Sequence, residues 1–325
     1  MLGSDAEHGQ TQHGQVSAAL ASRNGLTGLL APGATLERLA GGCTWSEGPL
    51  WLPDLGVVRW SDIPADRIKQ VELATGAVSV HRIGVEFTNG RALGHDGSVV
   101  QCSHGRRRLE REVDGHLESL VEHWHGARLN SPNDVVVKSD GTIWFSDPPY
   151  GITLDAEGHP GDREYQDNFV FRLDPVSGEL SVVVADVEEP NGLAFNPDES
   201  VLYVSDTSAA WSGDGTGNHH IRAYDVRDGR TCKNGRTIAV VDNGLPDGFA
   251  VDVGGNIWTS SRDAVIVLWP DGTTRGRIPV PEVVGNLCFG GPEGSDLFVA
   301  ATTSLYRIAT TTSCATGAAA AAAGR

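Results

Sequence analysis

Six polar residues at corresponding positions of a repeated pattern could together hold a metal ion. Their side chains are carboxylates or amides, whose oxygens suit calcium or magnesium better than zinc or copper. A cation balanced by two carboxylates can still polarise a carbonyl or phosphoryl oxygen. A simpler interpretation is that Asn and Asp only cap turns at strand entrances. The six positions, none of which holds His or Cys, are Glu47, Asn89, Asn133, Asn191, Asp247 and Asn286.

Each of these residues opens a stretch that predicts a β-hairpin. In "SPNDVVVKSDGTIWFSD" (131–147), an apolar run follows the polar residue, then a turn that contains Gly, then a second β-rich run. Five other stretches follow the same plan. A second pair of strand-like runs comes after each, most clearly at 68–83 and 169–184. One repeat therefore holds about four strands.

The spacing of the repeats predicts the architecture. The six polar residues are separated by 42, 44, 58, 56 and 39 residues. Four strands per repeat are typical of a propeller blade, so six copies predict an all-β fold, a six-bladed β-propeller. The last repeat is one strand short, and the N-terminal segment 34–42 is expected to close that blade. Because the first strand of each blade lines the central channel, the six polar residues are expected to form a ring at its mouth.

The rest of the chain divides around this propeller. We expect a disordered N-terminal segment (1–28), one propeller domain (29–310) and a low-complexity C-terminal tail (311–325). The two longest spacings come from insertions at 148–168 and 207–220. Both are rich in Gly and acidic residues, and such loops commonly rim a site.

Composition narrows the possible partners and locations. The 325 residues carry a formal net charge of −17, which would repel nucleic acids and anionic membrane surfaces. No run of 18 apolar residues could span a membrane, and the first residues lack a secretory signal, so we expect a cytoplasmic protein. Five scattered Cys favour neither a disulfide framework nor a zinc knuckle. The expected partner is a small molecule; the oligomeric state is left open.

Several motifs between residues 35 and 310 resemble the SMP-30/gluconolactonase/regucalcin family of six-bladed propellers. They are "SEGPLW", "LNSPNDVVV", "GTIWFSDPPYG", "EPNGLAFNPDE", "LYVSDT" and "PDGFAVD". The resemblance implies that Glu47, Asn191 and Asp247 are metal ligands and that Asn133 is a fourth ligand or a substrate contact. It also implies hydrolysis of aldonolactones and related cyclic esters. The implied cofactor is calcium, or another divalent cation such as magnesium, manganese or zinc.

Other residues are candidates for substrate binding. Asn89 and Asn286 belong to the same set of six and could line the pocket. His104 could carry a proton or be a hydrogen-bonded structural residue. Tyr150 could donate to a substrate oxygen or pack within its loop, and Arg128 could order its loop or bind a substrate hydroxyl or carboxylate.

The expected chemistry is attack of water on a lactone carbonyl that the metal polarises. Asp247 is the first candidate for the general base and Glu47 the second, while a metal-bound hydroxide would need neither. Two other function classes stay open. A phosphotriesterase of the diisopropylfluorophosphatase type would use a carboxylate to attack phosphorus, and a calcium-binding propeller would have no catalytic activity.

Overall fold

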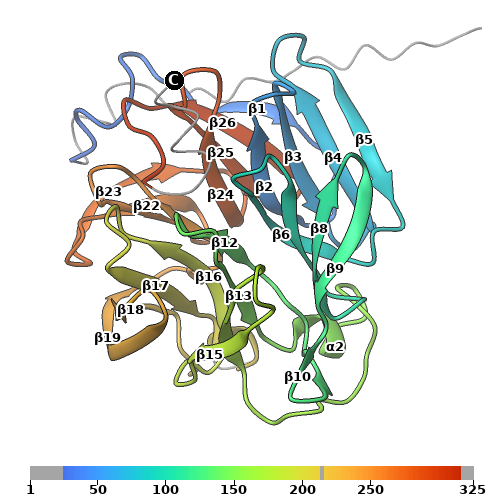
Figure 1. Cartoon of the computed structure of the whole chain (residues 1–325). Helices are drawn as coiled ribbons and strands as arrows, with labels where there is room; N and C mark the ends of the chain where they lie inside the picture. The colour runs from blue at the N-terminus through green and yellow to red at the C-terminus, as the bar shows by residue number, and fades with distance from the viewer. Residues whose placement is uncertain (1–24, 213–215, 316–325) are drawn as a thin grey trace, which may run out of the picture.

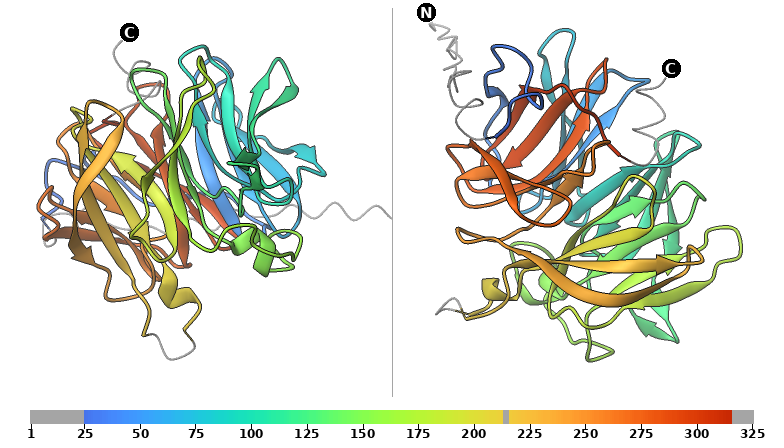
Figure 2. Two further views of the ribbon diagram at one scale, coloured as in Figure 1. Left: turned by 60° about the horizontal axis from the view of Figure 1, so that its bottom comes forward. Right: turned by 90° about the vertical axis from the view of Figure 1, so that its left-hand side faces the viewer.

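Six four-stranded antiparallel sheets form the framework of the described chain. This computed structural model describes residues 25–212 and 216–315. In five sheets the strands follow chain order, and in the sixth the order is β1-β26-β25-β24. The sheets are arranged around a central axis (Figures 1 and 2). The predicted all-β, six-bladed propeller is therefore confirmed.

The strands of each blade are as follows, from the axis outward. Blade one holds β2 (Ser46–Leu52), β3 (Val57–Asp62), β4 (Arg67–Glu72) and β5 (Val78–Ile83), and blade two holds β6 (Thr88–Leu93), β7 (Val99–Ser103), β8 (Arg108–Val113) and β9 (His116–Val121). Blade three holds β12 (Val135–Val137), β13 (Ile143–Asp147), β14 (Phe169–Leu173) and β15 (Leu180–Val184), and blade four holds β16 (Pro190–Phe195), β17 (Val201–Asp206), β18 (His220–Arg227) and β19 (Thr231–Val240). Blade five holds β20 (Phe249–Val251), β21 (Ile257–Thr259), β22 (Ala264–Leu268) and β23 (Thr274–Pro279), and blade six holds β24 (Val284–Gly290), β25 (Asp296–Ala301), β26 (Ser304–Ala309) and β1 (Glu37–Ala40).

The N-terminal strand β1 closes the last blade, as the sequence predicted. It pairs antiparallel with β26, with Glu37 opposite Arg307 and Arg38 opposite Tyr306. The first and last parts of the propeller thus share one sheet. Closure of this kind covers the edge that β26 would otherwise expose.

The hydrophobic core lies between neighbouring blades. One cluster, for example, joins Trp144 of blade three to Phe195 of blade four, and another joins Trp258 of blade five to Phe289 of blade six. Each sheet therefore buries both faces against its neighbours. This explains why even the second strands read as nearly continuous apolar runs.

Glycines let the inner strands of neighbouring blades approach one another closely. The inner strands contact each other around a closed ring, from β2 through β6, β12, β16 and β20 to β24. Gly90 N–H donates to Asn133 O at 2.9 Å, and Gly192 N–H donates to Asp247 O at 3.0 Å. A Cβ on either glycine would overlap the neighbouring backbone.

Serines at the ends of the second strands hold the next blade. The hydroxyl of Ser61 donates to Asn89 O at 3.2 Å, and that of Ser146 donates to Asn191 O at 2.7 Å. The hydroxyl of Ser205 likewise donates to Asp247 O at 3.0 Å. The aspartates that follow these serines bind backbone N–H groups of their own blade; Asp206, for example, accepts from Glu188 N–H.

Short elements and the two ends complete the structure. The short helices α2 (Tyr150–Thr153) and η1 (Ser208–Ala210) lie in the two predicted insertions, and β10 (His123–Trp124) pairs with β11 (Ala127–Arg128). Leu26 is buried, and Asp252 forms an isolated bridge with Cys314, so described parts of both predicted end segments pack on the propeller. Residues 1–24 and 316–325 lie outside the described residues. No helix within the described ranges is long and apolar enough to cross a membrane.

We expect Gly192→Ala to destabilise the fold, because the new methyl group would meet the backbone of the neighbouring blade at Asp247 and Gly248. Overpacking of this kind typically lowers the free energy of unfolding by about 1–3 kcal/mol. Gly161→Ala is the matched control, because its Cβ would have a single neighbour, at 3.8 Å. Denaturant unfolding of the two variants tests this, and equal stabilities would contradict the close approach.

Candidate active site

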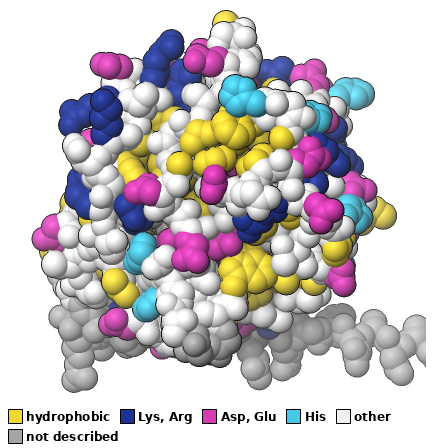
Figure 3. All heavy atoms as spheres, turned by 90° about the horizontal axis from the view of Figure 1, so that it is seen from below, with side chains coloured by type: hydrophobic (Ala, Val, Ile, Leu, Met, Phe, Trp, Pro, Cys, Tyr) yellow, Lys and Arg dark blue, Asp and Glu magenta, His cyan; other side chains and the backbone are white. Residues whose placement is uncertain are grey.

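Five of the six predicted polar residues line one cavity at the mouth of the channel. We call it the upper cavity; it lies on the side of the propeller where α2 is, which is at the bottom of Figure 1, and its volume is about 330 Å³. Glu47, Asn89 and Asn191 sit near the start of β2, β6 and β16, whereas Asn133 and Asp247 lie two residues before β12 and β20. All five are buried. Figure 3 shows the molecule from the side on which α2 lies, where acidic side chains are interspersed with hydrophobic ones.

Glu47 is a buried carboxylate with one oxygen unused. Its Oε2 accepts a hydrogen bond from Gly48 N–H at 3.0 Å, but its buried Oε1 has no hydrogen-bond partner. Burial raises the pKa of Glu47 well above its usual range, and the negative charges of Asp247 and Asp134 raise it further. A cation beside Oε1 would reverse this destabilisation of the ionised form.

Asp247 shares the cavity with a carboxylate that sequence reasoning missed. Burial raises the pKa of Asp247 to about 8, with further increases from the charges of Glu157 and Asp134, while a hydrogen bond from Asn191 opposes the rise. Glu157 lies in the first insertion and lines the same cavity. Burial raises the pKa of Glu157 to about 7. The cavity thus gathers three carboxyl groups that resist simultaneous ionisation.

His104 lies behind the ring residues and does not line the cavity. Its side chain is fully buried, with Nδ1 3.0 Å from Glu157 O and Nε2 3.3 Å from Asn89 Nδ2. Burial lowers the pKa of His104 to about 4. Its imidazole is therefore neutral at physiological pH. In this position His104 is a hydrogen-bonded residue behind the ring, and its predicted role in substrate binding or proton transfer stays a prediction.

Tyr150 lines the cavity, but its hydroxyl is already bonded. Tyr150 Oη lies 2.6 Å from Thr207 Oγ1, and its ring stacks on Trp211 with centroids 5.2 Å apart. Burial raises the pKa of Tyr150 well above its usual range. Tyr150 therefore joins the two insertions at the rim of the cavity.

Arg128 lies outside the residues that line the cavity. It belongs to the β10–β11 hairpin, its guanidinium donates to Arg106 O at 3.0 Å, and its backbone N–H donates to Glu164 at 2.7 Å. The predicted role in substrate binding is not supported by this position. Ordering of the loop, the other role considered, agrees with these contacts.

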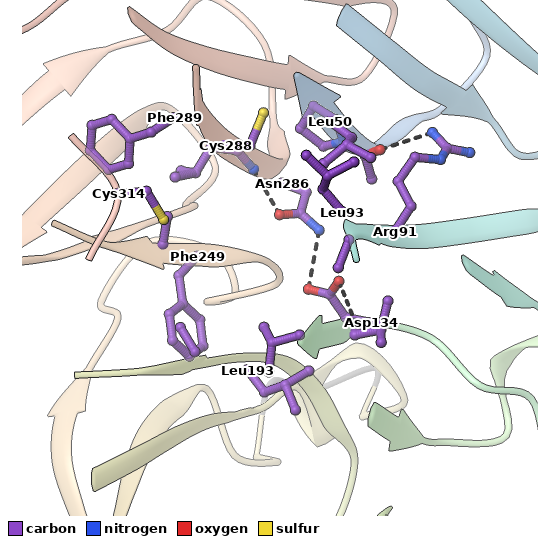
Figure 4. A pocket seen from close by; sticks show the side chains of 18 of the residues that line it. Leu50, Arg91, Leu93, Asp134, Leu193, Phe249, Asn286, Cys288, Phe289 and Cys314 are labelled. Atoms are coloured by element: carbon purple, nitrogen blue, oxygen red, sulfur yellow. Dashed lines mark hydrogen bonds between the residues drawn. The ribbon is translucent and has the colours of Figure 1, made fainter. Parts of the chain in front are cut away.

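Asn286, the sixth polar residue, lies in a deeper layer of the channel. Its Nδ2 donates to Asp134 Oδ2 at 3.3 Å, and its Oδ1 accepts from Leu287 N–H at 2.8 Å (Figure 4). Burial raises the pKa of Asp134 to about 6. Beyond this pair the channel becomes an apolar lower cavity lined by residues such as Leu50, Leu93 and Phe249. The Asp134–Asn286 layer therefore lies between the ring and the lower cavity.

Sequence reasoning missed several residues that line the upper cavity. Besides Glu157, they include Trp45, Ile63, Thr207 and Arg262. Glu157 and Thr207 lie within the two insertions expected to rim a site. Ile63 and Thr207 come directly after the second strands of their blades, so the repeat itself marks this position.

The donor set fits a hard divalent cation. Glu47 and Asp247 supply two carboxylates, Asn133 and Asn191 supply amide oxygens, and Glu47 Oε1 is buried without a partner. In the described ranges no three or more His, Cys, Asp or Glu side chains cluster as a metal site. The candidate site therefore depends on its amides, and carboxylate and amide oxygens are ligands that calcium and magnesium accept.

The chain is similar in sequence and in structure to a family of known proteins. Residues 45–303 match the family model described as "SMP-30/Gluconolactonase/LRE-like region". A gluconolactonase of Zymomonas mobilis is 31% identical over 88% of this chain and 84% of its own length. A pentonolactonase of Haloferax volcanii is 32% identical over 79% of this chain and 81% of its own. The solved structure of a gluconolactonase from Xanthomonas campestris superposes with a TM-score of 0.81 at 38% identity, covering 91% of this chain and 93% of that one.

We expect Asp247→Asn to flatten the pH dependence of stability in protein freed of divalent cations. The folded-state pKa of about 8 lies above the unfolded value of about 3.9. The stabilisation from the neutral carboxyl is thus fully present below pH about 4 and is lost as the pH rises through about 8. Denaturant unfolding between pH about 5 and 9 should show a steeper decline for the unmodified chain. Parallel curves would contradict the assignment.

Proposed function

The chain belongs to the SMP-30/gluconolactonase/LRE-like family, and from this premise we propose that it is a lactonase that hydrolyses sugar lactones in the upper cavity with a divalent cation. The observation that carries the proposal is the pair of buried carboxylates, Glu47 and Asp247, facing one cavity beside three asparagine amides. Such a pair is unfavourable on its own and becomes favourable around a cation.

The proposed substrate is an aldonolactone. Relatives with at least 31% identity over most of the chain bear the names gluconolactonase and pentonolactonase. The cavity of about 330 Å³ suits a small molecule, and polar groups from the ring and from Glu157 could hydrogen-bond with sugar hydroxyls. A cytoplasmic location stays a prediction from the sequence.

Glu47, Asn133, Asn191 and Asp247 would hold the cation, for which calcium is our first choice because all donors are oxygens. When bound, the cation would polarise the lactone carbonyl and stabilise the charge that develops on its oxygen. It would also lower the pKa values of Glu47 and Asp247, so that both act as carboxylates near neutral pH.

The chain's own residues would move the protons. Asp247 is the proposed general base: it takes a proton from the water whose oxygen bonds to the carbonyl carbon. Glu47 is the second candidate. The bond between that carbon and the oxygen of the lactone ring then breaks, and this lactone oxygen takes up a proton to become a hydroxyl group. Glu157, with its pKa raised to about 7, can exchange a proton near neutral pH and faces the same cavity.

Removal of divalent cations by a chelator should abolish lactone hydrolysis, because Glu47 and Asp247 would then be left without the charge that favours their ionised forms. Calcium or a similar ion should restore the rate. Acid release from gluconolactone and from a pentonolactone, corrected for spontaneous hydrolysis, measures this. Full activity in thoroughly demetallated protein would contradict the proposed cation.

Asp247→Asn separates the roles of ligand and base. The change keeps one oxygen but removes the proton acceptor, so a base at this position predicts a loss of turnover on the order of 10²–10⁴. The loss should persist across a cation titration that saturates the site. Recovery of most of the rate at saturation would instead mean that Asp247 is a ligand only.

A further inference from the structure

We infer that His104 and Thr207 are positioning residues that turn the amide oxygens of the ring toward the cation. This inference rests on the proposed function, because it concerns the ligands of the proposed cation. Each of these two side chains accepts a hydrogen bond from the NH₂ end of a ring asparagine, which leaves the oxygen at the opposite end of that amide.

The two residues occupy one repeated position, directly after the second strand of a blade. In blades one, two and four this residue donates its backbone N–H to the carbonyl that lies two residues before the ring residue. The bonds are Ile63 to Trp45 O at 3.2 Å, His104 to Phe87 O at 3.3 Å and Thr207 to Glu189 O at 3.0 Å. All three side chains therefore start from the same level beside the ring.

The side chain at this position differs with the type of ring residue beside it. Blade one has the carboxylate Glu47, whose two oxygens are equivalent, and the apolar Ile63 stands there. Asn191, a proposed ligand, and Asn89, which lines the same cavity, have one oxygen and one NH₂ group each, so a neighbouring side chain can decide which end of the amide faces the cavity. Thr207 and His104, which can accept hydrogen bonds, stand beside these two residues.

The tautomer of His104 follows from its partners. Nδ1 lies 3.0 Å from the carbonyl oxygen of Glu157, which can only accept, so Nδ1 carries the proton. In a neutral imidazole Nε2 must then accept. Its neighbours are Asn89 Nδ2 at 3.3 Å and Asn133 Nδ2 at 3.5 Å. One imidazole thereby orients two amides and ties them to the first insertion.

Thr207 is constrained in a similar way. Its hydroxyl donates to Glu189 O at 3.3 Å, which leaves its oxygen to accept from Tyr150 Oη at 2.6 Å and from Asn191 Nδ2 at 3.4 Å. Thr207 is almost fully buried, so water has little access to replace these bonds. The NH₂ end of Asn191 is thus held by this hydroxyl and by its hydrogen bond to Asp247.

The amide oxygens of the two proposed asparagine ligands, Asn133 and Asn191, are free to bind a cation, and the oxygen of Asn89 is free for a substrate. Among the residues that the structure describes, no donor is hydrogen-bonded to Oδ1 of Asn89, Asn133 or Asn191. A reversed amide would present N–H groups to the cation, which repel it. Residues that orient metal ligands in this way typically change affinity by about 10–100-fold when they are removed.

The test compares isosteric variants in calorimetric titrations of demetallated protein with calcium chloride. Thr207→Val removes the acceptor at nearly constant shape, and Thr207→Ser restores it. We expect calcium affinity to fall about 10–100-fold in Thr207→Val and in His104→Phe, and by much less in Thr207→Ser. Ile266→Val is the control, because it changes packing in a hydrophobic core cluster outside the upper cavity, and its calcium affinity should stay unchanged.

The outcomes separate this inference from the proposed function. If the unmodified chain binds calcium and Thr207→Val binds it as tightly as Thr207→Ser, the positioning role is wrong while the cation site stands. If the unmodified chain binds no divalent cation, the proposed function fails and the inference falls with it. Thermal melts followed by circular dichroism check folding. Should His104→Phe fail to fold, the pair of Thr207 variants still decides the question.

Discussion

The structure depends on the close approach of six inner strands around one axis. Directly after the ring residues the backbones of neighbouring blades lie so close together that a Cβ atom would not fit between them. The residues at this place in blades two and four are therefore glycines, Gly90 and Gly192. Backbone groups buried at this depth need partners, because an unpaired one is costly. The partners come from neighbouring blades, through glycine N–H groups and the hydroxyls of Ser61, Ser146 and Ser205. The same bonds that close the propeller therefore fix the backbone of the ring.

The ring and the deeper Asp134–Asn286 layer together concentrate negative charge away from solvent. Glu47, Asp134 and Asp247 are all buried, and each of the last two raises the pKa of Glu47. Simple packing would favour apolar residues at these positions, since buried like charges destabilise a fold. A bound cation would favour the ionised carboxylates and offset their mutual repulsion, which is why this arrangement supports the proposed cation site.

Much of the architecture could be predicted from the sequence because it is repeated. Five of the six polar positions, the hairpins and the N-terminal strand of blade six followed from periodic patterns, and β1 pairs with β26 as expected. The finer placement of side chains was less accessible. Asn286 was assigned to the ring one residue too late. Gly285 O accepts from Gly248 N–H at 2.7 Å, just as Asp247 O accepts from Gly192 N–H, so Gly285 holds the ring position of blade six. Asn286 therefore occupies the place that Gly90 and Gly192 hold in other blades, and it bonds to Asp134, which has the same place in blade three. The repeat pattern alone did not fix this one-residue difference in register, because Gly285 has no side chain to mark the ring position.

Residues from the insertions were harder to place because no repeat constrains them. Loop length showed that 148–168 and 207–220 would rim a site, but not that Glu157 would face Asp247 or that Tyr150 would bond to Thr207. Likewise, residue type made His104 a plausible proton carrier, whereas burial keeps it neutral. Burial and hydrogen-bond direction are properties of the assembled fold. In the proposed function, the ring supplies the cation ligands. The two insertions contact the ring through His104 and Thr207 and line the same cavity, so changes in the insertions would alter the substrate-binding surface and leave the ring in place.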